Sequence, residues 1–295
     1  MEDKIMRFLA YDGKISVVCA NTTNLVEKAR KIHDLSPLAT ATFGRLLTIT
    51  SIMAQEMKNS SDKLTIQIKG NGPIGILTAV ADSKGNVKGY VGDGKVDLPL
   101  RKSDGKLDVG GAVGKQGMLY IIKDLGIGKP YVGMTPIVSG EIAEDFTNYF
   151  ATSEQVPSAV GLGVLVDVDG SVKQAGGFII QMMPYAEEET ISKLEKKIAE
   201  FKSVTYALEH EHTPEKMMED LLGDMDMKIY EKVPTQFHCN CSKERVEKAV
   251  ISVGKKEIQN MIDDGEPIEV NCHFCNTHYH YSVDDLKRML NEATR

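Results

Sequence analysis

Residues 63–91 read KLTIQIKGNGPIGILTAVADSKGNVKGYV, and this stretch indicates the architecture of the larger part of the chain. Apolar and polar side chains alternate in its runs KLTIQIKG, ILTAVAD and VKGYV, which is the pattern of half-buried strands. Short glycine-containing segments, NGPIG and SKGN, separate these runs as turns. Strands joined by short turns pair antiparallel, so the stretch predicts an antiparallel sheet.

The same pattern recurs on both sides of this stretch. Residues 6–11 and 15–20 predict a hairpin with a turn at Asp12-Gly13, and residues 159–184 predict another. Three helices are expected between these hairpins, at 21–33, 36–57 and 141–150. Because few helices separate the strands, we predict an α+β fold with a largely antiparallel sheet, in an N-terminal domain of residues 1–184.

The helix expected at 36–57 has apolar residues on several faces. Ser36-Pro37 predicts its start, since serine caps a helix and proline suits its first turn. Apolar residues on several faces predict a buried helix, and Arg45 and Glu56 argue against a membrane span. The N-terminus lacks the apolar stretch of a signal peptide, so we expect a cytoplasmic protein with no membrane partner.

Residues 185–233 differ in composition from their neighbours and predict a charged helical linker. They carry 13 Asp and Glu against seven Lys, so six of the chain's seven net negative charges lie here. Apolar residues spaced by three, four or seven predict one face of an amphipathic helix. These residues are Ile191, Leu194, Ile198, Phe201 and Leu208. Thr213-Pro214 starts a shorter helix that Gly223 can end. One apolar stripe cannot form a core of its own.

Residues 234–295 predict a small C-terminal domain. They contain four of the five cysteines, helices near 242–250 and before Gly265, and short strands in PIEV and THYHY. Ser282 caps a final helix. A domain of about sixty residues is marginal without a staple, so a bound metal is physically reasonable.

The four clustered cysteines occur as Cys239-x-Cys241 and Cys272-x-x-Cys275. Two thiolate pairs on tight turns can bind one zinc ion tetrahedrally, and four sulfur ligands leave no position for a catalytic water. This clustering indicates a reducing compartment rather than a secreted disulfide framework. Four nearby histidines offer substitute ligands, but four thiols suffice, so we expect the imidazoles beside the site or on the surface. They are His238, His273, His278 and His280.

The Cys-x-Cys spacing leaves two roles open. Structural zinc ribbons usually have two residues between the cysteines at both ends. The tighter pair can oxidise, once the metal is lost, to a strained and labile small-ring disulfide. Structural Cys-x-Cys sites also exist, so spacing alone does not separate a folding metal from an oxidisable switch.

Other function classes find little support. The segment 70–75 matches G-x-G-x-x-G, but a strand follows where a dinucleotide site needs a helix. No nucleophile and base, open metal site or cofactor loop indicates an enzyme in residues 1–184. A net charge of −7 argues against nucleic acid as a partner. The alternative kept open is a zinc-ribbon nucleic-acid-binding protein with structural zinc.

Six blocks are distinctive in their order and spacing. They are GNGPIG (70–75), VGKQGMLYIIKDLG (113–126), YFATSEQVPSAVGLGVLVD (149–167), QAGGFIIQMMP (174–184), FHCNCSKERVEKAV (237–250) and NCHFCNTHYHY (271–281). In these blocks the chain resembles the 33 kDa chaperonin family, the redox-regulated holdase chaperones, over nearly its full length. The cysteine pattern matches in full, and only the charged linker is loosely specified.

The resemblance implies a redox switch. In the reduced form the four cysteines would bind one Zn²⁺ per chain, fold the C-terminal domain and brace the linker on the N-terminal domain. Oxidant would form Cys239–Cys241 and Cys272–Cys275 disulfides, release zinc and loosen the linker. The zinc-free form would be an ATP-independent chaperone that binds unfolding client proteins, acts as a homodimer and catalyses no reaction.

The composition of the linker indicates what such loosening would expose. Flexible surfaces rich in methionine adapt to varied apolar partners, and an acidic background keeps them soluble. The predicted client-binding residues are Ile191, Leu194, Ile198, Phe201, Leu208, Met217 and Met218. The fifth cysteine, Cys19, lies in an apolar strand pattern and is expected to be buried and inert.

Overall fold

The computed structural model of the chain describes residues 2–184, 186–211, 213–223 and 225–292. The chain divides into two compact units, an N-terminal unit (Met1–His238) and a C-terminal unit (Cys239–Arg295). Three residues that bound the predicted domains, 1, 185 and 295, lie outside the described residues. The division into 1–184, 185–233 and 234–295 stays a prediction.

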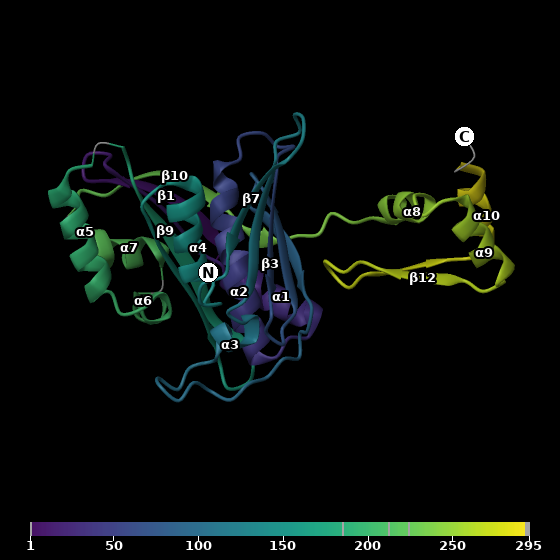
Figure 1. Ribbon diagram of the computed structural model, residues 1–295, viewed down its shortest axis with the longest axis horizontal. Coiled ribbons are helices and arrows are strands. Elements are labelled where there is room, and N and C mark those ends of the chain that lie inside the picture. The colour runs from purple at the N-terminus through teal and green to yellow at the C-terminus, as the bar shows by residue number, and fades with distance from the viewer. Residues whose placement is uncertain (1, 185, 212, 224, 293–295) are drawn as a thin grey trace. The chain divides into compact units, whose positions relative to one another are not determined.

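The N-terminal unit contains two sheets, with strand orders β10-β1-β2-β9-β8 and β11-β5-β4-β3-β6-β7 (Figure 1). The five-stranded sheet consists of β1 (Lys4–Ala10), β2 (Ile15–Asn21), β8 (Ser158–Val166), β9 (Val172–Met182) and β10 (Lys228–Pro234). The six-stranded sheet consists of β3 (Lys63–Gly70), β4 (Ile76–Asp82), β5 (Asn86–Val91), β6 (Gly117–Asp124), β7 (Tyr131–Pro136) and β11 (Gln236–Phe237). Within the described residues only β11 and β5 pair in parallel, which confirms the predicted α+β class with antiparallel sheets.

Helix α2 (Pro37–Met53) packs against strands of both sheets and forms the centre of the main core (Figure 1). Every residue of α2 except Pro37 and Arg45 is buried, as its all-round apolar sequence predicts. Its buried threonines donate hydrogen bonds to carbonyl oxygens one turn earlier, for example Thr48 to Gly44 at 2.8 Å. No hydroxyl of these threonines is therefore buried without a partner. Ser36 caps the helix by accepting a hydrogen bond from the Ala39 N–H.

Other short elements complete the N-terminal unit. They are α1 (Thr23–His33), a 3₁₀ turn (Ala54–Glu56), α3 (Val109–Val113), α4 (Ala143–Tyr149) and a π turn (Phe150–Glu154). The expected helix to residue 57 ends at Met53, where the 3₁₀ turn begins. The sequence did not predict α3, because its glycines favour turns. Asp108 caps α3 by accepting a hydrogen bond from the Gly111 N–H.

The linker segment forms three helices: α5 (Glu188–Glu200), α6 (Val204–Glu211) and α7 (Pro214–Leu222). The prediction of one continuous apolar face was wrong, because the chain becomes extended at Phe201. Ser203 then accepts a hydrogen bond from the Tyr206 N–H and starts α6. Thr213 caps α7, and the helix ends before Gly223, as predicted. The sequence predicted no strand after these helices. The structure has two: β10 adds to the five-stranded sheet and β11 adds to the six-stranded sheet.

The linker helices cover one face of the five-stranded sheet. Buried residues of β1, β2 and β9, such as Phe8 and Phe178, pack with buried residues of α5, α6 and α7 in what we call the second cluster. Its members are Met6, Phe8, Ala10, Ile15, Val17, Cys19, Phe178, Ile180, Leu194, Val204, Ala207, Leu208, Met217, Met218, Leu221, Leu222 and Met225. The linker helices therefore bury their apolar side chains against the five-stranded sheet, because a single apolar stripe is too small to form a separate core.

The C-terminal unit consists of a hairpin and three helices. They are α8 (Lys243–Ile251), α9 (Lys255–Asp263), β12 (Ile268–Asn271), β13 (His278–Tyr281) and α10 (Val283–Glu292). Ser242 caps α8 by accepting a hydrogen bond from the Arg245 N–H. As expected from the sequence, Ser282 exchanges hydrogen bonds with Asp285 at the start of α10. The described helices of the whole chain include none long and apolar enough to cross a bilayer.

Candidate metal centre

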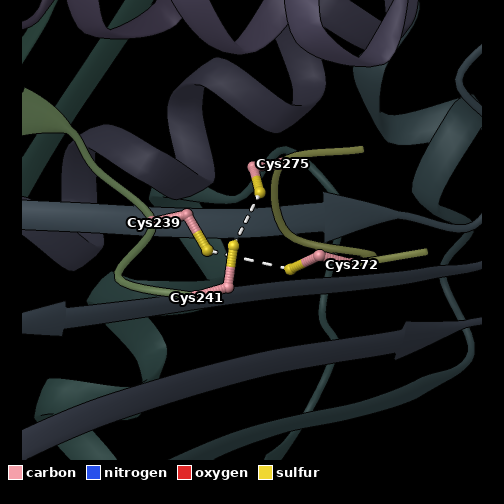
Figure 2. Close-up of side chains that lie close together, drawn as sticks. All are labelled: Cys239, Cys241, Cys272 and Cys275. Carbon is pink, nitrogen blue, oxygen red and sulfur yellow. Dashed lines mark hydrogen bonds between the residues drawn. The ribbon is translucent and has the colours of Figure 1, made fainter. Parts of the chain in front are cut away.

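Two turns of the C-terminal unit bring four cysteine side chains together (Figure 2). Cys239 and Cys241 lie in the irregular segment before α8, which forms the first turn, and Cys272 and Cys275 lie in the second turn, between β12 and β13. The four sulfur atoms lie within 4.8 Å of one another, and each residue is partly buried. Figure 2 shows the side chains converging from the two turns.

Backbone hydrogen bonds shape the second turn. The Cys272 carbonyl accepts from the N–H groups of Cys275, at 3.1 Å, and Asn276, at 2.8 Å. The Cys272 N–H donates to the Thr277 carbonyl at 3.0 Å, and Asn276 takes the left-handed conformation with a φ of 52°. Asparagine tolerates this conformation better than most residues. The two intervening residues therefore let the backbone curl so that both sulfurs face the same point.

Sulfur separations fit a tetrahedral metal and do not fit a disulfide. The Sγ atoms of Cys239 and Cys272 are 3.8 Å apart, and those of Cys241 and Cys275 are 3.3 Å apart. Zinc–sulfur bonds of about 2.3 Å at tetrahedral angles place sulfurs about 3.8 Å apart, whereas a disulfide bond is about 2.05 Å long. All five cysteines are free thiols. The arrangement is that of a reduced, metal-binding cluster.

The electrostatics of the cluster also favour a cation. Burial raises the pKa of Cys239 and the pKa of Cys272 above the usual thiol range. Burial also opposes ionisation of Cys275, but hydrogen bonds with Thr277, Cys241 and Cys239 outweigh it and lower the pKa of that thiol to about 7. Four thiolates at this spacing repel one another, so all four can ionise together only around a positive ion. Zn²⁺ suits this sulfur donor set.

Two hydroxyl groups contact the sulfurs, and the sequence analysis missed both. The Tyr279 hydroxyl donates to the Cys241 Sγ at 3.1 Å, and the Thr277 Oγ1 lies 3.2 Å from the Cys275 Sγ. Hydrogen bonds from such neighbours orient metal ligands and tune their basicity. The signal in the sequence was the alternation in THYHY, which places Thr277 and Tyr279 on one face and the histidines between and beyond them on the other.

The nearby histidines stand outside the sulfur cluster. Nδ1 of His278 lies 2.9 Å from Glu269, and Nδ1 of His280 lies 3.4 Å from the same carboxylate. Both side chains are more than half exposed. Within the described residues, the group that can hold a metal contains the four cysteines and neither His238 nor His273. These positions agree with imidazoles on the surface or beside the site.

The predicted client-binding residues lie in or against the second cluster, with one exception. Leu194, Leu208, Met217 and Met218 are buried in it, and Ile198 and Phe201 are partly buried against it. Ile191 instead lines a separate hollow beside Met182 and Met183. A role in client binding stays a prediction for all seven.

Cys19 also belongs to the second cluster and is fully buried. Its Sγ lies 4.0 Å from the Pro214 carbonyl oxygen. Burial raises the pKa of this thiol well above its ordinary value, so it stays protonated and unreactive in this conformation. This position agrees with the expected inert role.

Comparisons with known proteins support one family over the whole chain. A family model described as Hsp33 protein matches residues 3–282. A 33 kDa chaperonin of Lachnoclostridium phytofermentans is 54% identical over 293 residues, covering 99% of this chain and 100% of that protein. A 33 kDa chaperonin of Clostridioides difficile is 49% identical over 292 residues, again with 99% and 100% coverage.

A solved structure agrees. The crystal structure of a 33 kDa chaperonin from Thermotoga maritima superposes with a TM-score of 0.91 at 38% identity, covering 100% of this chain and 99% of that one. The fold, the sulfur cluster and the sequence relatives point the same way. The chain belongs to the Hsp33 protein family.

Proposed function

We propose that this chain is a redox-regulated, ATP-independent holdase chaperone that binds unfolding proteins and prevents their aggregation under oxidative stress. The observation that carries the proposal is the group of four free thiols within 4.8 Å of one another, in a unit with a very small core. Membership of the Hsp33 family supports it. We place the protein in the cytoplasm, where thiols are kept reduced.

In the reduced form, Cys239, Cys241, Cys272 and Cys275 hold one zinc ion per chain as thiolates. Structural zinc contributes on the order of 10–16 kcal/mol of apparent binding free energy at pH 7. Among its described residues, the C-terminal unit has a core of five buried apolar residues, and a core this small supplies less net stability than this contribution. These residues are Val250, Ile258, Tyr281, Leu286 and Met289. The metal and the fold of this unit therefore depend on each other.

Oxidant activates the protein by removing its metal ligands. Each disulfide forms when two thiolates give up two electrons, which together with two protons from the solvent reduce one peroxide to two waters. We assign the pairs Cys239–Cys241 and Cys272–Cys275. The shortest sulfur separations in the reduced cluster instead join Cys239 with Cys272 and Cys241 with Cys275. Without the ion the C-terminal unit unfolds and the contacts between its two cysteine segments, such as Tyr279 with Cys241, are lost, so each cysteine keeps a nearby partner only in its own segment.

Unfolding of the C-terminal unit loosens the linker and exposes apolar surface. Our candidate client-binding side chains are Ile191, Leu194, Ile198, Phe201, Leu208, Met217 and Met218. Four of these side chains are buried and the other three partly buried in the reduced form, which fits an inactive resting state. The acidic background of the segment keeps the opened form soluble. The oxidised form acts as a homodimer.

The test combines zinc release with suppression of aggregation. The zinc-loaded protein is treated with peroxide under mild heat, the released zinc is measured with a chromogenic chelator, and aggregation of an unrelated unfolding protein is followed by light scattering. We expect one zinc released per chain and suppression only after oxidation. Equal suppression by the reduced, zinc-loaded protein would contradict the switch.

Matched cysteine variants test the ligand assignment. Cys239→Ser is expected to lose high-affinity zinc, whereas Cys19→Ala, at a cysteine outside the cluster, is expected to keep it. Peptide mapping of the oxidised protein identifies the disulfide pairs. Unchanged zinc affinity in Cys239→Ser would refute the ligand assignment.

A further inference from the structure

Strand β10 is an edge strand that contributes almost nothing to either core. None of its seven residues is buried, and its large apolar side chains Ile229 and Tyr230 are 45% and 50% exposed. Its attachment to the sheet therefore depends mainly on backbone pairing with β1, which is antiparallel.

The sequence of β10 has the features by which edge strands avoid pairing with further chains. KIYEKVP contains two lysines and a terminal proline, and a bulge opposite Arg7 and Phe8 leaves Tyr230 without a partner in the ladder. β1 is the opposite kind of strand, because Met6, Phe8 and Ala10 are fully buried in the second cluster. Strand β10, which resists pairing with further chains, thus covers the edge of β1, which is suited to such pairing.

Ionic contacts connect β10 to the linker helices. The Glu215 carboxylate of α7 lies 2.6 Å from the Lys4 Nζ of β1 and 3.1 Å from the Lys232 Nζ of β10. Arg7 of β1 also pairs with Glu231 of β10 at 3.2 Å. When α7 leaves the sheet, Lys232 loses its partner and β10 is held less firmly.

The residues after β10 are anchored much more strongly. Thr235 Oγ1 lies 2.8 Å from the Ser51 Oγ and donates to the Gly85 carbonyl at 2.9 Å. Phe237 is 1% exposed and lies in the main core. Strand β10 is therefore held weakly, between the linker helices before it and the firmly bound residues Thr235 and Phe237 after it. Release of the linker removes the contact between Lys232 of β10 and Glu215 of α7.

We propose that an extended segment of a client polypeptide pairs with β1 in the place of β10 once the linker is released; this rests on the proposed holdase function. The β1 edge offers backbone N–H and C=O groups to any extended chain, so affinity does not require a particular sequence. Met6 and Phe8, uncovered when α5–α7 leave, accept apolar side chains at alternate positions. Strand β10 shows that an antiparallel strand fits this edge.

Amide hydrogen exchange of β1 tests the proposal in three states of the full-length protein. The states are zinc-loaded and reduced, oxidised alone, and oxidised with a permanently unfolded, reduced and carboxymethylated protein as client. We expect the β1 amides that donate to β10 to be protected, then unprotected, then protected again. The β1 amides that donate to β2 stay protected throughout and serve as the internal control.

A matched pair of charge reversals probes the hold of β10 in the reduced protein. Glu231→Lys places a like charge beside Arg7, so the β1 edge amides should exchange about two- to fivefold faster. Glu219→Lys makes the same charge change on α7, where Glu219 pairs with Lys216 on the surface, and should leave these amides unchanged. Equal rates in both variants would overturn the idea that β10 is held by these contacts.

Aggregation assays on the same samples separate the two proposals. If the oxidised protein suppresses aggregation while the β1 edge stays protected without client, or stays unprotected with client, strand pairing at β1 is overturned and the holdase function stands. Protection that returns with rising chaperone concentration and no client would show a second copy of the chain at this edge, which also overturns it. Failure to suppress aggregation overturns the proposed function and this inference with it.

Discussion

The two units of this protein reach stability by different routes. In the N-terminal unit, α2 and its neighbours form a main core of some forty buried apolar residues that includes Leu46 and Phe237. In the C-terminal unit, the corresponding cluster has five. An apolar core of the first size sustains a fold unaided, whereas one of the second size needs a staple. The four clustered cysteines lie in the unit with the smaller core, so, with the metal we propose there, its loss is expected to unfold that unit selectively.

The largest expected effect is selective unfolding when the metal site is removed. In Cys272→Ser, or after strong chelation, the C-terminal unit loses a contribution on the order of 10 kcal/mol and unfolds. Limited proteolysis should then degrade residues after about 238 and leave a resistant N-terminal fragment. Cys19→Ala should give no such pattern. If the amides of β12 and β13 stay protected from hydrogen exchange after the metal is removed, the C-terminal unit does not depend on the metal and the proposed difference between the units is wrong.

The same leucine truncation should have different consequences in the two units. Leu46 of α2 and Leu286 of α10 are both fully buried, and each Leu→Ala change costs about 2–5 kcal/mol. Leu46→Ala should lower the thermal midpoint of the N-terminal unit and leave zinc affinity unchanged. Leu286→Ala should weaken zinc binding by about thirtyfold or more, because folding and binding are coupled.

Calorimetry and zinc competition titrations on both leucine variants provide the measurements. If Leu286→Ala retains wild-type zinc affinity, the C-terminal fold does not depend on its metal, and the contrast between the units fails.

A smaller effect is expected at the sulfur cluster itself. Tyr279→Phe removes the hydroxyl that donates to the Cys241 Sγ, and loss of such a neighbour typically weakens metal binding about 10- to 100-fold. The matched control is Tyr281→Phe, which removes a hydrogen bond to the Lys243 carbonyl and none to sulfur. Cobalt substitution provides the readout, since only Tyr279→Phe should shift the thiolate charge-transfer band. Identical bands in both variants would exclude a role for the Tyr279 hydroxyl.

The smallest expected effect is a pH dependence confined to the N-terminal unit. Hydrogen bonding with Arg30 lowers the pKa of Glu27 to about 2, helped by the Val172 N–H. A depressed folded-state pKa gives stability that is present above the unfolded value of about 4.3 and is lost as the pH falls towards 2. Glu27→Gln should therefore cost up to about 1 kcal/mol at pH 7, because the pair is near the surface.

Denaturant unfolding of the N-terminal unit at a series of pH values measures this difference. It should shrink below pH 4 and vanish near pH 2. A difference that stays constant across this range would show that the Glu27 charge is not its source.

Local signals predicted most elements of both units. Ser36-Pro37, Thr213-Pro214 and Ser282 mark helix starts because caps and prolines act within one turn. Strands β3 to β5 follow from alternation in residues 63–91. The four cysteines were predicted as metal ligands from their spacing alone, since each pair lies on one short turn, which is a local structure.

The failures have a common cause. Strand β10 reads KIYEKVP, and its pairing depends on the distant β1 rather than on its own pattern. The break between α5 and α6 puts Phe201 against Phe178 of the sheet, a tertiary contact that the helical spacing does not reveal. The Tyr279 hydroxyl reaches Cys241 only because the hairpin carries it there.

By itself, the sequence determined that this protein has an α+β body, a charged linker and a four-cysteine motif. These follow from alternation, composition and short spacings, which act between near neighbours along the chain. Only the tertiary structure decided that the linker helices bury their stripe on β1, β2 and β9, and that β10 covers the β1 edge. The contacts that involve β1 and β2 join residues about two hundred positions apart, and complementary surfaces fix them in ways no local pattern encodes.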